Sequence, residues 1–145
     1  MFNPSRYRII AVGKIRKSWI QTALNLYIKR LPGLLITEIK DSNINKEAQA
    51  IRSSLKQDEL LIALSEEGES LTSIAFSNRL QKLGSQRIAF IIGGPDGLSP
   101  DIKSLAHYCF SISPMTFPHE IARFLLLEQI YRATTIANRG PYHRE

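Results

Sequence analysis

The chain of 145 residues is 43% hydrophobic and 22% charged, with a formal net charge of +6; these values are ordinary for a globular protein and sufficient for one domain with a core. No apolar run reaches the roughly 18 residues that a membrane span needs, and the N-terminus carries no cleavable signal pattern. The single cysteine, Cys109, excludes an internal disulfide and suits a reducing compartment, so we expect a cytoplasmic protein without a membrane partner.

The first half of the chain alternates between strand and helix patterns. Ser18-x-x-Gln21 has the spacing of a capping box and predicts a helix start, and Pro32-Gly33 predicts the end of that helix. The apolar residues that recur on one of its faces, which we expect to point inward, are Trp19, Ala23, Leu26 and Tyr27. Further patterns predict strands at 7–13, 34–39 and 60–65, helices at 45–55 and 70–83, and a surface turn at 66–69.

The second half opens with a continuous apolar run from Ile88 to Ile92, which is typical of a strand buried on both faces. Gly93-Gly94 carries no Cβ, so the backbone can come close to whatever lies at the end of this strand. Pro95-Asp96-Gly97 has turn chemistry, and Ser99-Pro100 predicts an N-cap and a first helical residue. We expect this helix to reach about residue 107, then a strand at 109–113, a loop at 114–118 and a long apolar helix at 119–137.

Alternating strands and helices predict an α/β fold with a mostly parallel sheet flanked by helices, and no domain boundary divides residues 1–145. A strand, a glycine turn and a helix in succession place a small ligand at the carboxyl edge of such a sheet. The turn lacks the GK[ST] ending of a phosphate-binding loop, and its glycine spacing differs from the dinucleotide fingerprint.

The charge is distributed unevenly along the chain. Residues 1–40 hold eight Lys and Arg residues against one acidic residue, and the remainder is nearly balanced. A basic surface is often only a solvated face. An excess that is concentrated in one segment, including Lys14, Arg16 and Lys17, favours a polyanionic partner instead.

The histidines offer no metal site, because His107, His119 and His143 are not spaced as ligand pairs with one another or with Cys109. We interpret His107 as a helix-end residue and Cys109 as a small buried hydrophobe. The prediction is therefore neither a metal centre nor a cysteine nucleophile.

The long C-terminal helix carries a charged pair on an otherwise apolar surface. Glu128 and Arg132 are four residues apart and share a face, either as an ordinary surface salt bridge or as part of a groove. An exposed apolar stripe of Phe124, Leu127 and Tyr131 would favour dimerisation.

The last eight residues, 138–145, form a tail after the helix. Termini are normally dispensable. Tyr142-His143-Arg144, however, combines a stacking ring, an imidazole and a planar guanidinium in three residues, a set that suits an unstacked RNA base.

Three motifs in order carry a family resemblance: GGPDGLSP at 93–100, SISPMTFPH at 111–119 and YHRE at 142–145. Together they resemble the RlmH family of SPOUT-class 23S rRNA pseudouridine-N3 methyltransferases, over essentially the whole chain. The resemblance implies a trefoil-knot fold, S-adenosylmethionine as methyl donor and N3 of pseudouridine 1915 of 23S rRNA in the large ribosomal subunit as acceptor. It also implies a homodimer in which the tail of one subunit completes the site of the other, with no DNA partner.

The resemblance further implies a set of cofactor-binding residues: Leu64, Gly93, Ile112, Ser113, Pro114, Met115, Thr116 and Phe117. The apolar members of this set can form a slot for adenine, and the irregular backbone around Pro114 leaves polar groups free for its edge. The alternative is that Met115 and Phe117 are core residues beneath a turn.

The expected catalytic residues are His143, Glu128, Arg132, Tyr142 and Arg144. Since imidazole changes protonation state near neutral pH, His143 is the first candidate for the general base and Glu128 the second. The two arginines can hold phosphate or offset charge on the uracil carbonyls, and Tyr142 can stack on the base. Two other functions stay open: a non-catalytic RNA-binding or ribosome-assembly protein, and a knotted methyltransferase that acts on tRNA.

Overall fold

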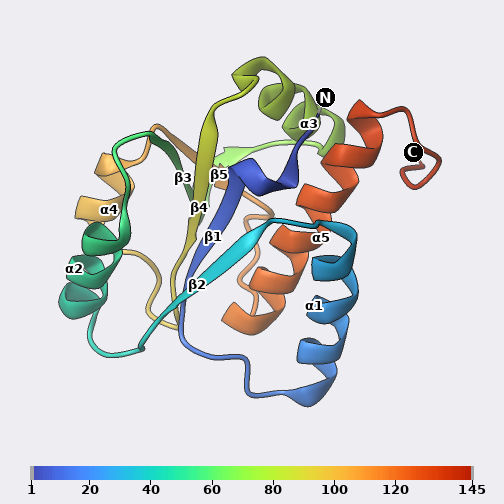
Figure 1. The fold of residues 1–145 in the computed structure, drawn as a ribbon. Helices are drawn as coiled ribbons and strands as arrows, with labels where there is room; N and C mark the ends of the chain where they lie inside the picture. Colours follow the sequence, from blue (N-terminus) through green and yellow to red (C-terminus); the bar gives the residue numbers. More distant parts are fainter. Residues whose placement is uncertain (1, 145) are drawn as a thin grey trace.

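Five strands form one parallel sheet in the order β2-β1-β4-β3-β5 in the computed structural model, which describes residues 2–144 (Figure 1). A short 3-10 helix, η1, spans Pro4–Arg6 before the first strand. The strands are β1 (Tyr7–Val12), β2 (Leu35–Ile39), β3 (Glu59–Ser70), β4 (Arg87–Ile92) and β5 (Tyr108–Ser111). The α-helices are α1 (Ser18–Arg30), α2 (Ile44–Ser54), α3 (Ser73–Leu83), α4 (Pro100–Leu105) and α5 (His119–Ala137).

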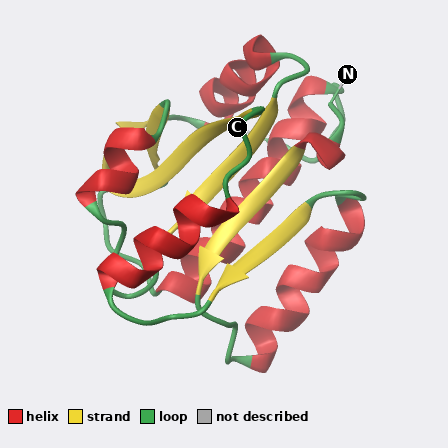
Figure 2. Cartoon of the chain, turned by 60° about the vertical axis from the view of Figure 1, so that its left-hand side comes forward, coloured by secondary structure: helices red, strands yellow, loops and turns green. Residues whose placement is uncertain are grey.

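The helices form two layers, with α1, α3 and α5 on one face of the sheet and α2 and α4 on the other (Figures 1 and 2). Alternate residues of β1 face the two layers: Ile9 packs with α1, α3 and α5, whereas Ile10 packs with α2 and α4. Each fully buried side chain of this kind contributes about 1.5–3 kcal/mol. The predicted α/β fold with a mostly parallel sheet is therefore confirmed, and the trefoil knot stays a prediction.

Several local predictions are confirmed. The strand expected around Ile88–Ile92 is buried on both faces and lies at the centre of the sheet. Ser99 caps α4, since its Oγ accepts a hydrogen bond from the Ile102 N–H at 3.2 Å. The longest helix has the expected bounds, His119–Ala137. Within residues 2–144, no helix combines the length and the apolar character that crossing a membrane requires.

The surface turn predicted at 66–69 is wrong, because β3 continues through these residues to Ser70. The strand bulges between Leu64 and Glu69, and both of these residues pair with Phe110 of β5. Pairing with a distant strand therefore overrides the local turn chemistry of the Glu66–Glu69 segment. As a consequence α3 begins three residues later than predicted, at Ser73, with Thr72 as its N-cap.

The capping box predicted at the start of α1 is also wrong. The N-cap residue is Lys17, and its side chain makes no capping hydrogen bond. Instead the backbone N–H groups of Arg16 and Lys17 donate to a carboxylate oxygen of Glu120, at 3.0 and 3.2 Å. This acceptor comes from α5, which lies about a hundred residues further along the chain.

The inward face of α1 was predicted incorrectly in part. Ile20 and Leu24 are its buried residues, whereas Trp19 is 61% exposed and Leu26 is 49% exposed. The helix is apolar on two sides, so periodicity alone does not determine which side packs. The apolar stripe predicted on α5 also needs correction, because Leu127 is fully buried in the core that α5 shares with α1 and α3.

We predict that Gly68→Ala destabilises the protein by about 1–3 kcal/mol, because a Cβ there would overpack the contact between β3 and β5. That Cβ would lie 2.6 Å from the backbone carbonyl carbon of Phe110. Urea denaturation measures the effect. Gly140→Ala is the matched control, since the nearest atom to its new Cβ would be at 3.5 Å. Equal stability of the two variants would contradict the tight packing of β3 on β5.

Candidate functional site

A cleft of about 350 Å³ opens at the carboxyl ends of β4 and β5, beside Leu64–Glu67 of β3 and the first turn of α5. It lies where strand, glycine turn and helix were predicted to place a ligand. Seven of the eight predicted cofactor-binding residues line the cleft: Leu64, Gly93, Ile112, Ser113, Met115, Thr116 and Phe117. The eighth, Pro114, is not among the lining residues.

The turn after β4 forms one wall of this cleft and is closed by its own backbone. Gly97 has φ of 76° and donates its N–H to the Gly94 carbonyl at 2.9 Å. A Cβ on Gly93 would lie 2.5 Å from the Gly97 carbonyl carbon. A residue without a Cβ is thus required at position 93 so that the backbone of Gly97 can pack closely against it. This corrects the expectation that the missing Cβ of Gly93 makes room chiefly for a ligand.

The loop after β5 forms the opposite wall and is tied back to β3. The Thr116 hydroxyl donates to the Glu66 carboxylate at 2.8 Å, and the Met115 N–H donates to the Ser113 hydroxyl at 3.1 Å. Met115 is 72% exposed, so the alternative interpretation of this residue as part of the core is wrong. Phe117 is half-buried at the cleft wall.

Polar residues that were not predicted also line the cleft: Glu66, Glu67, Asp96, Lys103 and His119. Lys103 pairs with Glu67 at 3.7 Å. The two glutamates were missed because their segment was taken for a turn at the surface. Asp96 lies within the glycine turn itself, so its position in the sequence could have identified it as a residue of the cleft wall.

Four of the five predicted catalytic residues come together beside the second half of α5. Tyr142 donates its hydroxyl proton to the Glu128 carboxylate at 2.7 Å, and Arg132 donates to the same carboxylate at 2.7 Å. The Arg132 guanidinium also lies over the Tyr142 ring, 4.7 Å from its centroid. The fifth residue, Arg144, is exposed beyond this cluster, and Glu145 lies outside the described residues.

Glu128 is only 9% exposed, so the pair with Arg132 is not an ordinary surface salt bridge. The carboxylate accepts hydrogen bonds from Gln129, Arg132 and Tyr142. Both oxygens of the carboxylate are therefore engaged in hydrogen bonds, and Glu128 has little capacity to accept a hydrogen bond from a further donor.

Tyr27 of α1 anchors the tail from the neighbouring helix. Its hydroxyl lies 2.8 Å from the Tyr142 hydroxyl. Because the Tyr142 proton is directed at Glu128, Tyr27 must donate to Tyr142. Burial, together with the bonds to Tyr27 and the Glu128 carboxylate, raises the pKa of Tyr142 above its usual value, so that this phenol stays protonated at neutral pH.

His143 lies against Arg132, with 3.0 Å between its Nδ1 and the guanidinium Nη1. Arginine has no acceptor, so Nδ1 must accept this bond and the proton of the neutral ring must sit on Nε2. Nε2 is buried and has no hydrogen-bond partner among the described residues. In this conformation, the lone pair that a general base would use is already occupied.

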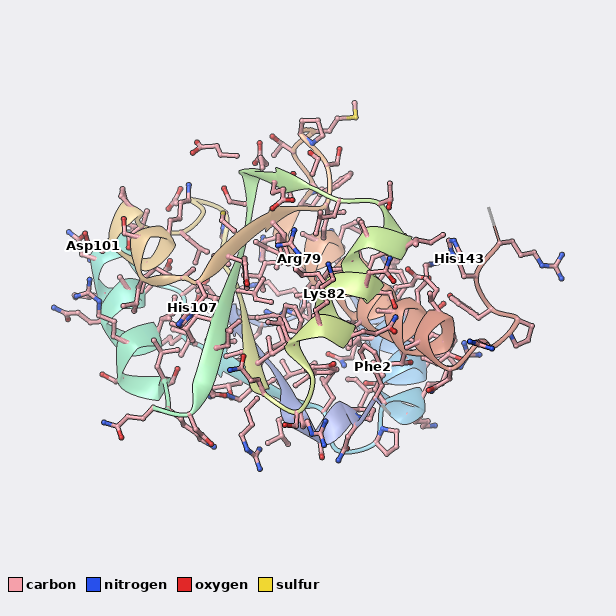
Figure 3. All side chains as sticks on the ribbon, turned by 90° about the horizontal axis from the view of Figure 1, so that it is seen from above. Phe2, Arg79, Lys82, Asp101, His107 and His143 are labelled. Atoms are coloured by element: carbon pink, nitrogen blue, oxygen red, sulfur yellow. The ribbon has the colours of Figure 1, made fainter. Side chains whose placement is uncertain are left out.

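The tail cluster and the cleft lie at opposite ends of the molecule. His119 and Ala122 of α5 line the cleft, whereas the tail follows the last turn of the same helix (Figure 1). Glu128, which binds the tail, lies nine residues along α5 from His119 in the cleft wall, which is about 14 Å at 1.5 Å per residue. Figure 3 places His143 at the outer edge, far from Asp101 of α4. One chain therefore does not bring its two sets of predicted residues together.

The surroundings of His107 and Cys109 indicate structural roles for both residues. His107 accepts a hydrogen bond from the Leu61 N–H at 3.1 Å on Nδ1, so it secures β3 in addition to following α4. Burial raises the pKa of the Cys109 thiol, which is the opposite of what a nucleophile needs. Within residues 2–144, no three His, Cys, Asp or Glu residues are grouped as metal ligands.

Comparison with known proteins identifies relatives along the whole chain. A family model described as "Predicted SPOUT methyltransferase" matches residues 5–143. The protein named "Ribosomal RNA large subunit methyltransferase H" of Prochlorococcus marinus is 65% identical over 144 residues, with 99% of each chain covered. The protein of the same name from a Synechococcus species is 61% identical over 142 residues, covering 98% of this chain and 99% of the relative.

Two solved structures share the fold. A probable methylase family protein from Haemophilus influenzae superposes with a TM-score of 0.63 at 11% identity, covering 98% of this chain and 72% of that one. The SpoU methyltransferase AviRb from Streptomyces viridochromogenes, solved in complex with AdoMet, gives a TM-score of 0.51 at 14% identity, covering 92% and 58%. At these identities the likeness concerns the fold alone.

We predict that Tyr27→Phe loosens the tail, because it removes the hydroxyl that donates to Tyr142. A lost hydrogen bond of about 1 kcal/mol corresponds to roughly fivefold faster amide hydrogen exchange at residues 140–144. Tyr131→Phe is the matched control: its ring also packs on Tyr142, at 4.8 Å between centroids, but no side-chain hydrogen bond of its hydroxyl is found among the described residues. Equal exchange in both variants would mean that packing alone holds the tail.

Proposed function

We propose that this chain, which belongs to the SPOUT methyltransferase family, transfers the methyl group of S-adenosylmethionine to N3 of a pseudouridine in 23S rRNA of the large ribosomal subunit. The observation that carries the proposal is identity of 65% over 99% of the chain to a protein named for methylation of large-subunit ribosomal RNA. The resemblance of the three motifs together to the RlmH family supports pseudouridine 1915 as the nucleotide. A ribosomal substrate would place the protein in the cytoplasm.

The cleft fits S-adenosylmethionine in size and chemistry. Its volume of about 350 Å³ lies within the range of small-molecule sites. Leu64, Ile112 and Phe117 offer apolar walls for the adenine. The carboxylates of Glu66 and Asp96 suit the hydroxyl groups of the ribose and the positive charges of the sulfonium and the ammonium. When bound, the sulfonium supplies an already activated methyl group, so the residues of the chain chiefly position the acceptor and exclude water.

The tail cluster would then act on the target base. In the reaction the bond from sulfur to the methyl carbon breaks, a bond from that carbon to N3 forms, and the N3 proton leaves. Arg132 and Arg144 can offset the negative charge that grows on the uracil carbonyls as this proton departs. Tyr142 offers a ring for stacking. His143 can take the proton only when its Nδ1 separates from Arg132; otherwise its Nε2–H is a hydrogen-bond donor to the base and the proton passes to solvent.

The distance between cleft and tail supports a homodimer with shared sites. If two subunits pack with α5 helices antiparallel, the tail of each lies next to the cleft of the other. Trp19 and Leu26 give α1 an exposed apolar surface beside α5 that such packing would cover. Each site would then use the glycine turn of one subunit and Tyr142, His143 and Arg144 of its partner.

We expect the protein, incubated with isotope-labelled S-adenosylmethionine and ribosomes lacking this modification, to label a single nucleotide of 23S rRNA. Mapping of the labelled nucleotide by nuclease digestion and mass spectrometry measures the result, and bulk tRNA serves as the competing substrate. The matched control is Ile112→Lys, which places a cation in the cleft at a side chain that is 38% exposed. Ribosome binding without binding of S-adenosylmethionine would favour the RNA-binding alternative, and transfer to tRNA would favour the knotted tRNA methyltransferase.

We expect deletion of residues 141–145 to abolish methylation while sparing the fold, the dimer and most of the cofactor affinity, because the tail packs at the surface and away from the cleft of its own subunit. Mixing this deletion with the Ile112→Lys variant should then restore activity. In such a heterodimer one site combines an intact cleft with an intact tail, and the other carries both defects. Random exchange of subunits makes about half of the dimers mixed, and each mixed dimer has one intact site of its two. We therefore expect activity to return to roughly a quarter of the wild-type rate. No rescue under verified exchange would mean that each subunit completes its own site.

A further inference from the structure

Two buried charged residues lie in the first two turns of α5, beside the cleft. Glu120 is 6% exposed and Arg123 is 2% exposed. They are three residues apart and therefore share a face of the helix. Burying an arginine and a glutamate is costly unless each finds hydrogen-bond partners, so their contacts identify what these residues do.

Both side chains bind the backbone of the segment that joins β1 to α1. A carboxylate oxygen of Glu120 accepts the N–H groups of Arg16 and Lys17, at 3.0 and 3.2 Å. The Arg123 guanidinium donates to the carbonyl of Gly13 at 2.7 Å and to that of Val12 at 3.4 Å. A donor and an acceptor from one helix face thus hold the segment at both of its ends.

Arg123 also ties this segment to β2, because its Nη1 donates to the Glu38 carboxylate at 2.7 Å. Burial opposes ionisation of Glu120, but the two N–H groups of Lys17 and Arg16 outweigh it and lower the pKa of this carboxyl, which stays charged near neutral pH. We call Glu120 and Arg123 together the clamp. It consists of two full charges whose hydrogen bonds go mainly to backbone groups of the segment that joins β1 to α1.

The clamped segment carries the densest group of cations in the N-terminal part of the chain. The side chains of Lys14, Arg16 and Lys17 are exposed, whereas Ile15 between them packs against the core. Arg16 has one weak acidic neighbour, Asp41, at 3.7 Å between two exposed side chains. The segment borders the cleft: an atom at the Cβ position of Gly13 would lie 3.8 Å from Nε2 of His119, which lines the cleft.

From this arrangement we infer that residues 13–17 form a fixed cationic rim of the cleft that binds phosphates of the RNA substrate, and that Glu120 and Arg123 are the residues that position it. The inference rests on the RNA substrate of the proposed function. Because Glu120 already occupies the N–H groups of Arg16 and Lys17, their contacts to phosphate must come from side chains. Holding the backbone in place reduces the entropy that the loop would otherwise lose when RNA binds.

Glu120→Ala tests the clamp, with Glu120→Gln as the matched control, because the glutamine side-chain oxygen still accepts from the two N–H groups. Loss of these bonds, about 1.4 kcal/mol, should raise hydrogen exchange at the Arg16 and Lys17 amides and the Kd for ribosomes about tenfold. The loss of activity should fall on KM for ribosomes rather than on kcat. Glu120→Gln should restore the exchange rates and the ribosome Kd.

A double-mutant cycle separates positioning from general destabilisation. Lys14, Arg16 and Lys17 changed together to glutamine should reduce the slope of log Kd against log salt by about one unit for each lost phosphate contact. Glu120→Ala in this triple background should weaken ribosome binding no further, because Glu120 acts through the three cations. Additive losses would overturn the proposal, as would faster exchange in Glu120→Ala with unchanged ribosome affinity.

The same measurements distinguish failure of this inference from failure of the proposed function. Amide exchange and ribosome binding do not require methyl transfer, so a protein that binds ribosomes without methylating them would overturn the proposed activity and leave the cycle interpretable. A wild-type protein that does not bind ribosomes or their RNA would overturn the inference itself.

Discussion

The parallel pairing of β4 with β1 on one side and β3 on the other is the constraint on which the rest of the structure depends. Because β4 is buried on both faces, its register determines where the carboxyl ends of the neighbouring strands meet. The glycine turn at Gly93–Gly97 follows directly from this central position. The extension of β3 to Ser70 and its pairing with β5 then bring Glu66 and the loop at 112–117 to the same edge.

Helix α5 connects the cleft with the tail cluster, and its two halves make different contacts. Its first turns carry Glu120 and Arg123, which bind the backbone of the β1–α1 segment. Its second half carries Glu128 and Arg132, which bind the tail. Both pairs use charged groups that are largely removed from water, so each is costly to separate once formed. The helix is thus a rigid support that holds a cationic segment at the cleft and binds an aromatic and basic tail about 14–20 Å further along its axis.

The chemistry of the tail depends on hydrogen bonds that saturate its charged groups. Tyr27 donates to Tyr142, Tyr142 donates to Glu128, and Arg132 donates both to Glu128 and to His143. The direction of each bond follows from which atoms carry protons. Within this tail cluster, the buried Nε2 of His143 has no hydrogen-bond partner among the described residues, and an unpaired buried donor is unfavourable by about 1–3 kcal/mol. The cluster therefore favours an acceptor at this position, as a base in a shared site would provide.

Local sequence determined much of this protein: the alternation of elements, the capping of α4 by Ser99, the bounds of α5 and most residues of the cleft wall all follow from periodicity, turn chemistry or motif. The tertiary structure alone decided the course of β3 through Glu66–Glu69, the inward face of α1 and the burial of Leu127. It also decided that Glu120 binds the backbone just before α1 and that Tyr27 anchors Tyr142. The physical reason is the same in each case. The deciding partner lies 41 to 115 residues away or on another element, and neither local propensity nor the hydrophobic period carries information about it.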